Sequence, residues 1–129
     1  MGWKRVARPV VAPDYARFRD GFAAMLDPAL YPVEWLDEQV GSGNFVLLSE
    51  GDSAILISVR TYPSGLKELH GEAALGNLAV ITGNLIPLAL QFGKSIGCAL
   101  ARIESRPGWS KALRNDGWTL HQVALQKSL

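Results

Sequence analysis

The sequence is poor in cysteine and in histidine. Its 129 residues include one cysteine, Cys98, and two histidines. A single thiol cannot form an internal disulfide, and this favours a reducing, cytoplasmic setting. A zinc site needs three or four convergent donors, and the few available here have no metal-ligand spacing, so we predict no metal site.

The sequence also lacks an excess of charge of either sign. Thirteen basic residues face twelve acidic ones, which leaves a formal net charge of +1. A chain without a global electrostatic field has little attraction for a polyanion, so we expect no nucleic-acid partner.

Long uninterrupted apolar runs are missing as well. The most apolar window, residues 75–92, is broken by glycines, polar residues and a proline. It therefore falls short of a membrane span, and we expect no membrane association. Residues 1–11 carry three basic side chains between apolar ones and lack the continuous apolar core of a secretory signal, so we expect a soluble protein.

No repeat, low-complexity tract or linker-like segment divides the chain. A length of 129 residues with 48% hydrophobic content is typical of one compact domain. We therefore expect a single domain over residues 1–129.

Residue periodicity predicts an order of helices and strands along the chain. Turn residues and apolar spacing predict a strand at 1–11, helices at 13–27 and 32–41, and strands at 45–49, 54–62 and 66–75. The last third then reads as a helix at 84–96, a strand at 98–106, a short helix at 107–115 and an alternating strand at 118–127. Such a mixture indicates an α/β fold with a mostly antiparallel sheet.

The strand at 66–75 has an unusual polar face. Alternation places Glu68, His70 and Glu72 on one side of it. A strand inside a helix-covered sheet should be apolar on both faces, so these side chains either face solvent or line a cleft. In a cleft, Glu72 or His70 could act as a general base.

The strand at 98–106 is half polar in the same way, with Arg102 and Glu104 on one side. If it neighbours the strand at 66–75, these charges form either an ion-pair ladder on an open face or part of a substrate cleft. The sequence leaves both interpretations open.

The complete order of elements resembles the GNAT superfamily of acyl-CoA-dependent N-acyltransferases over essentially the whole chain. The ending is the most suggestive local feature, since a short helix leads to Gly117 and Trp118 before the last predicted strand. The resemblance implies a splayed sheet of about six to seven strands flanked by about four helices. It also implies that the fourth and fifth strands part to admit the pantetheine arm of acetyl-CoA.

The resemblance further implies a diphosphate loop with the pattern Gln/Arg-x-x-Gly-x-Gly/Ala at the start of the third helix. The register that fits covers residues 78–83, and only Gly83 matches. Thr82, Gly83 and Asn84 are accordingly the candidate cofactor-binding residues, although an ordinary helix cap explains Asn84 equally well. The tyrosine that serves many family members as general acid falls at Leu113, which cannot donate a proton.

Two functional hypotheses follow. In the first, the protein is an acyl-CoA-dependent N-acyltransferase, and Glu72 or His70 accepts a proton from a small-molecule or peptide amine. In the second, it is a catalytically inactive GNAT-fold accessory or interaction protein, of the kind found among bacterial and phage-related proteins. An exposed sheet edge or a tryptophan patch could in addition support a homodimer.

Overall fold

The computed structural model describes residues 2–104 and 108–129. The chain forms, in order, α1 (Gly2–Met25), α2 (Val33–Gly41), β1 (Val46–Glu50), β2 (Ser53–Thr61), β3 (Lys67–Leu75), α3 (Leu78–Val80), the π-helical turn η1 (Ile81–Leu85), α4 (Ile86–Ser95), β4 (Cys98–Ile103), α5 (Gly108–Leu113) and the 3-10 turn η2 (Arg114–Asp116). None of the helices in these ranges is long and apolar enough to cross a membrane.

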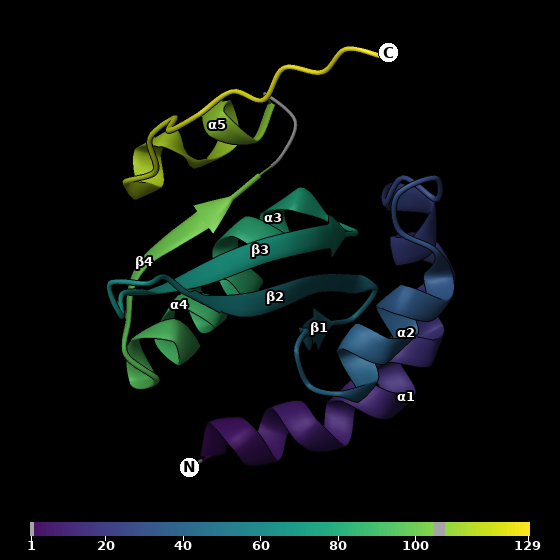
Figure 1. The fold of residues 1–129 in the computed structure, drawn as a ribbon. Coiled ribbons are helices and arrows are strands. Elements are labelled where there is room, and N and C mark those ends of the chain that lie inside the picture. The colour runs from purple at the N-terminus through teal and green to yellow at the C-terminus, as the bar shows by residue number, and fades with distance from the viewer. Residues whose placement is uncertain (1, 105–107) are drawn as a thin grey trace.

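The described residues form one four-stranded mixed sheet in the order β1-β2-β3-β4 (Figure 1). The first three strands are antiparallel neighbours, joined by tight turns in which Gly51 and Gly65 adopt positive φ. β4 returns parallel to β3 after the helical segment α3–η1–α4. This crossover places that helical segment against one face of the sheet.

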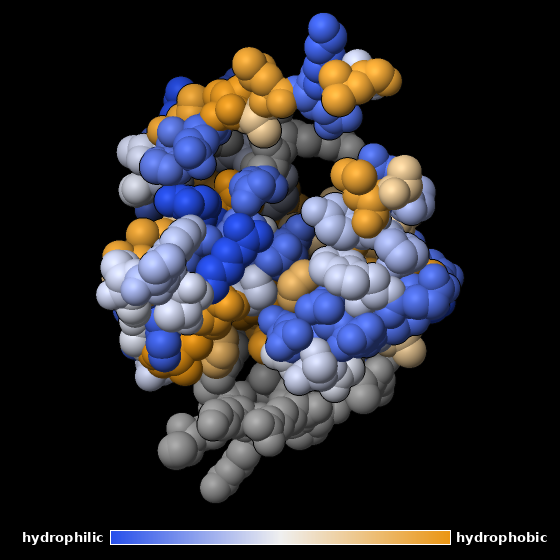
Figure 2. Space-filling view, in the orientation of Figure 1, coloured by the Kyte–Doolittle hydropathy of each residue, from blue (hydrophilic) through white to orange (hydrophobic). Residues whose placement is uncertain are grey.

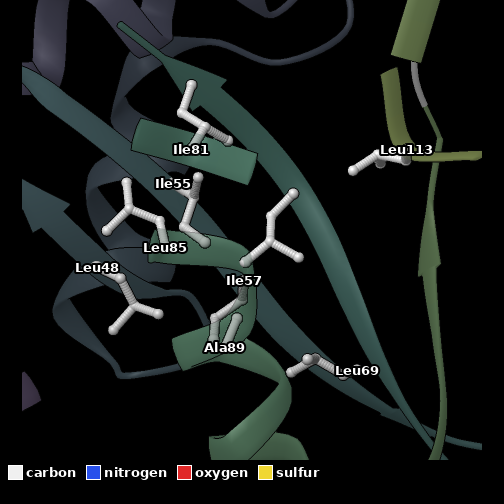
Figure 3. Packing of buried hydrophobic residues seen from close by; sticks show 9 residues of the cluster. Leu48, Ile55, Ile57, Leu69, Ile81, Leu85, Ala89 and Leu113 are labelled. Carbon is white, nitrogen blue, oxygen red and sulfur yellow. The ribbon is translucent and has the colours of Figure 1, made fainter. Parts of the chain in front are cut away.

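Each face of the sheet is covered by its own helices. Because side chains alternate along a strand, Leu56 packs with α1 and α2, whereas Ile55 and Ile57 pack with η1 and α4. The cluster below α1 and α2 contains Phe18, Phe22, Leu36, Val40, Phe45, Leu47, Ala54 and Leu56. The opposite cluster contains Leu48, Ile55, Ile57, Leu69, Ile81, Leu85, Ile86, Ala89 and Leu113 (Figure 3).

The two predicted terminal strands are wrong. Residues 2–11 belong to the helix α1 instead. Residues 118–127 have no regular structure, and Leu120 and Leu125 are 73% and 94% exposed. An alternating pattern forms a strand only beside a partner strand, and this segment passes α5 instead (Figure 1).

The described sheet therefore has four strands rather than the six to seven that were expected. The predicted strand at 98–106 is observed as β4, and the predicted helix at 107–115 as α5 followed by η2. Arg106 and Pro107, at the junction of these two predictions, lie outside the described residues.

The start of the third helical segment also differs from the prediction. The helix begins at Leu78 rather than at Asn84, and Asn77 caps it by accepting a hydrogen bond from the Val80 amide at 3.2 Å. Ile81 and Leu85 are 3% and 2% exposed in the core. The stretch that was expected to be a loop is thus a core-facing part of the helix.

Candidate functional site

A cleft opens where β3 and β4 separate. The two strands pair from Lys67↔Cys98 to Gly71↔Ile103, and β3 then continues alone on this side to Leu75. Figure 3 shows the strands close together at one end and diverging toward the other, with Leu113 across the gap from Ile57.

This cleft contains a cavity of about 580 Å³. Its lining is mostly aliphatic, from both sheet strands and helices, with Trp109 and Trp118 contributing aromatic surface. A volume of this size lies in the range of small-molecule sites.

A β-bulge interrupts β3 at the mouth of the cleft. Ile57 of β2 pairs with Gly71 and Leu56 pairs with Ala73, so Glu72 is the extra residue of the bulge, with no residue of β2 opposite it in the strand register. The extra residue reverses the alternation, and Ala73 therefore packs toward α1 and α2, on the face opposite Leu69. Uninterrupted alternation along the strand predicts Ala73 on the same face as Leu69, and the bulge shows this prediction to be wrong.

Glu72 lies between two cavities. It lines the cleft cavity and also a second cavity of about 530 Å³ that borders α2. Its side chain is 19% exposed, accepts a hydrogen bond from the Ser58 hydroxyl at 2.5 Å and lies 3.8 Å from the Arg60 guanidinium. A half-buried carboxylate shared by two cavities has the position that proton transfer between two bound groups requires.

The other predicted carboxylate on this face, Glu68, is fully buried. Its oxygens accept hydrogen bonds from the Tyr62 hydroxyl at 2.6 Å and pair with His70 Nδ1 at 2.9 Å and with Arg102 at 3.2 Å. Burial by itself raises the pKa of Glu68, but the bonds from Tyr62 and His70 and the Arg102 charge outweigh it, so the pKa is lowered. Glu68 therefore holds a network together and stays ionised.

His70 is enclosed by the same network. Its side chain is 3% exposed, and Nε2 lies 3.4 Å from Glu104 while Nδ1 bonds Glu68. Both ring nitrogens thus face carboxylates. His70 also contributes to the wall of the second cavity. Of the two predicted bases, Glu72 is the more accessible to a substrate.

Polar side chains gather over the middle of the sheet on this face, between α5 and α2 (Figure 2). The network that includes Glu68 extends toward the C-terminal segment, because Arg102 also lies 3.3 Å from His121 Nε2. The Glu68 bond and charge raise the pKa of the Tyr62 hydroxyl, so that it remains a donor. The charges for which the sequence left open an ion-pair ladder or a substrate cleft thus form a partly buried network.

The predicted cofactor-binding residues lie within the helical segment and not at its start. Thr82 donates its hydroxyl to the Leu78 carbonyl at 2.9 Å, and Asn84 donates to Glu50 at 2.7 Å. Gly83 is exposed, with open space where a Cβ would be. These contacts occupy the polar side chains that were expected to meet a diphosphate.

At the actual helix start, two amides are already bonded within the chain. The Asn77 amide donates to Ser53 Oγ at 2.9 Å, and the Val80 amide donates to the Asn77 side chain. These two amides at the helix start therefore already have acceptors within the chain. Leu113, to which the resemblance assigned the general-acid position, is 3% exposed in the apolar cluster. Among the described residues, no three histidines, cysteines or acids are grouped to hold a metal ion.

Sequence reasoning missed Ser58 and Arg60, both of which contact Glu72. They are two residues apart on β2, so they share a strand face, and this period-2 polar pair was the available signal. Their alignment with Glu72 depends on the pairing of β2 with β3, which the sequence does not display.

Comparison with known proteins supports the fold. No protein-family model matches the sequence, and no curated protein sequence matches it. The structure is similar to a probable acetyltransferase, with a TM-score of 0.61, 14% identity and coverage of 94% of this chain and 89% of that one. It is also similar to glucosamine-6-phosphate N-acetyltransferase from Arabidopsis thaliana, with a TM-score of 0.59, 12% identity and 92% coverage of both chains.

A third similar structure is an aminoglycoside N-acetyltransferase solved in complex with CoA, with a TM-score of 0.56 and 14% identity, covering 72% of this chain and 82% of that one. At such identities the likeness shows the fold alone. The chain thus has the GNAT-like α+β fold that its sequence resemblance predicted.

Proposed function

We propose that the protein is an N-acyltransferase that binds an acyl-CoA thioester in the β3–β4 cleft and transfers the acyl group to an amine in the second cavity. The observation that carries this proposal is the position of Glu72. It lies on the bulge, just past the last β3–β4 pair, and lines both cavities.

The chain supplies the base and the positioning groups for such a transfer. Glu72 accepts the proton that the amine loses as its nitrogen bonds to the acyl carbon and the carbon–sulfur bond breaks. Ser58 and Arg60 hold the Glu72 carboxylate in place. His70 also borders the second cavity, but both of its ring nitrogens face carboxylates, so we assign it a positioning role.

The fit of the thioester differs along its length. The apolar cleft suits a pantetheine arm, and the part of β3 past Gly71 offers backbone groups that β4 does not pair. The helix start, with two of its amides already bonded, does not suit the diphosphate. We therefore assign the arm to the cleft and assign no residue to the diphosphate.

A thiol-release assay with acetyl-CoA and a panel of primary amines tests this function. Glu72→Gln should lower kcat by about 10²–10⁴-fold, because it removes the base but keeps the side-chain shape. His70→Gln should keep the shape of the pH–rate profile, and Glu38→Gln, an exposed substitution on α2, serves as the matched control. A Glu72→Gln protein with wild-type turnover would exclude this residue as the base.

The inactive accessory protein is the second candidate, and the buried Leu113 favours it. A leucine at this place leaves no proton donor for a departing thiolate at the position where many family members have one. Calorimetric titration of acetyl-CoA and CoA separates the candidates. The acyltransferase requires heat on binding acetyl-CoA, whereas an absence of heat together with an absence of thiol release supports the accessory protein.

A further inference from the structure

The second cavity has an aromatic wall. The rings of Tyr31 and Trp35 lie 4.9 Å apart between centroids, and those of Trp35 and Phe45 lie 5.5 Å apart in an edge-on arrangement. All three residues line the cavity. Phe45 is 8% exposed and Tyr31 is 43% exposed, so the wall is anchored at its base and open at its rim.

The facing wall is acidic. Glu72 and Glu104 both line the cavity, and the single guanidinium of Arg60 lies 3.8 Å from one and 3.6 Å from the other. Because Arg60 is shared between these carboxylates, this group of three side chains carries a net negative charge. Such a wall attracts an ammonium group and repels a carboxylate on the substrate.

We infer that the acceptor is a primary amine that carries an aromatic group and has no carboxylate, that is, an arylalkylamine. This inference rests on the proposed acyltransferase function. The ring of the substrate lies against Trp35 and Tyr31, and its ammonium group approaches Glu72 and Glu104 beside the Arg60 guanidinium that these carboxylates share. The ammonium group gives its first proton to solvent, and Glu72 accepts the second as the nitrogen bonds to the acyl carbon and the thiolate of CoA leaves. Glu104 determines specificity, because it attracts the positively charged ammonium group as the amine enters.

The size of the cavity agrees with such a ligand. A volume of about 530 Å³ lies within the usual range for small-molecule sites. Gln39 and Asn44 add amide groups at the aromatic side, where a ring substituent could form hydrogen bonds. The cavity thus combines an apolar surface with a few polar groups, the usual composition of a specific site.

The test uses matched amines in the thiol-release assay with acetyl-CoA. Tryptamine and phenethylamine are compared with tryptophan and phenylalanine, which add only a carboxylate, and with glucosamine, which lacks the ring. We expect kcat/KM to be higher for the arylalkylamines by at least about 10-fold, because a single methylene group in an apolar pocket already changes it by about 10–200-fold.

Two variants locate the effect. Trp35→Leu should reduce the preference for arylalkylamines over glucosamine by about 10-fold. Glu104→Gln alters a side chain that is 69% exposed, so the fold should tolerate it, and it should raise KM for tryptamine and weaken discrimination against tryptophan. Glu38→Gln, outside the cavity, should leave both ratios unchanged.

The possible results separate the two levels of the proposal. Preference for arylalkylamines that Glu104→Gln weakens supports the inference. Faster acetylation of glucosamine or of the amino acids overturns the acceptor class and leaves the acyltransferase function in place. Acetylation of no amine, with acetyl-CoA that does not bind, overturns both.

Discussion

Replacing Glu68 with glutamine should destabilise the protein strongly. Glu68 is fully buried, and its two oxygens meet three donors on Tyr62, His70 and Arg102. Glutamine keeps one acceptor oxygen and turns an amide group toward the remaining donors. Removing one partner of a buried ion pair leaves the other charge uncompensated and lowers the free energy of unfolding by about 3–5 kcal/mol. For a chain of this length the expected fall in Tm is about 10–20 °C.

The pH dependence of this loss gives a sharper test than its size. The pKa of Glu68 is lowered in the folded state from an ordinary value of 4.5. A lowered carboxyl pKa stabilises the fold above the unfolded-state value, and the stabilisation disappears as the pH falls through the folded-state value. The difference in free energy of unfolding between wild type and Glu68→Gln should therefore be constant above pH 4.5 and narrow below it.

Urea denaturation followed by circular dichroism over this pH range measures the difference, with Glu38→Gln as the exposed control. We expect the control to stay within about 0.5 kcal/mol of wild type. The reasoning is refuted if Glu68→Gln unfolds like wild type at pH 7, or if the gap between them does not change as the medium becomes acidic.

Three further substitutions test how the helices and the turn after β3 are held in place. The Arg19 guanidinium and the Tyr15 hydroxyl, bonded to Asp37 at 2.8 Å and 2.6 Å, lower the pKa of Asp37 to about 2. Because Asp37 is 37% exposed and screened by solvent, Asp37→Asn should cost only about 1 kcal/mol at pH 7 in urea denaturation, a difference that fades between pH 4 and pH 2. Gly83→Ala should raise the free energy of unfolding by about 0.4–1 kcal/mol, since the site is helical and open. Gly76→Ala should lower the free energy of unfolding by more than about 1 kcal/mol, because φ at Gly76 is +106° and the new Cβ would lie 2.6 Å from the backbone of β2. Equal changes in the free energy of unfolding for Gly83→Ala and Gly76→Ala would contradict this prediction.

Elements whose pattern is decided locally could be predicted from the sequence. Leu36 and Val40, four residues apart in the predicted helix at 32–41, share one helix face by their spacing, and they are 1% and 5% exposed in the core. The strands that became β1, β2 and β3 were bounded by turn glycines, so their positions followed from residues a few places away. The predicted terminal strands failed because a strand requires a neighbouring strand, which local alternation does not specify.

The candidate site could be predicted in part. Alternation placed Glu68, His70 and Glu72 on one face, and the structure agrees. The ion pair of the buried Glu68 with Arg102 depends on β4, which pairs with β3 from far along the chain. The bulge at Glu72 is a matter of pairing between two strands, and a one-residue shift in pairing leaves no mark in composition.

Backbone amide shifts in a two-dimensional nitrogen-15 NMR titration with acetyl-CoA test the central claim most directly. If the thioester arm binds between the diverging strands, the largest changes should fall on Glu72, Ala73 and Ala74, with Ile103 of β4 also affected. The amides of β1, at the opposite edge of the sheet, should stay unchanged. Largest changes outside the β3–β4 cleft, or no changes at saturating acetyl-CoA, would contradict the account.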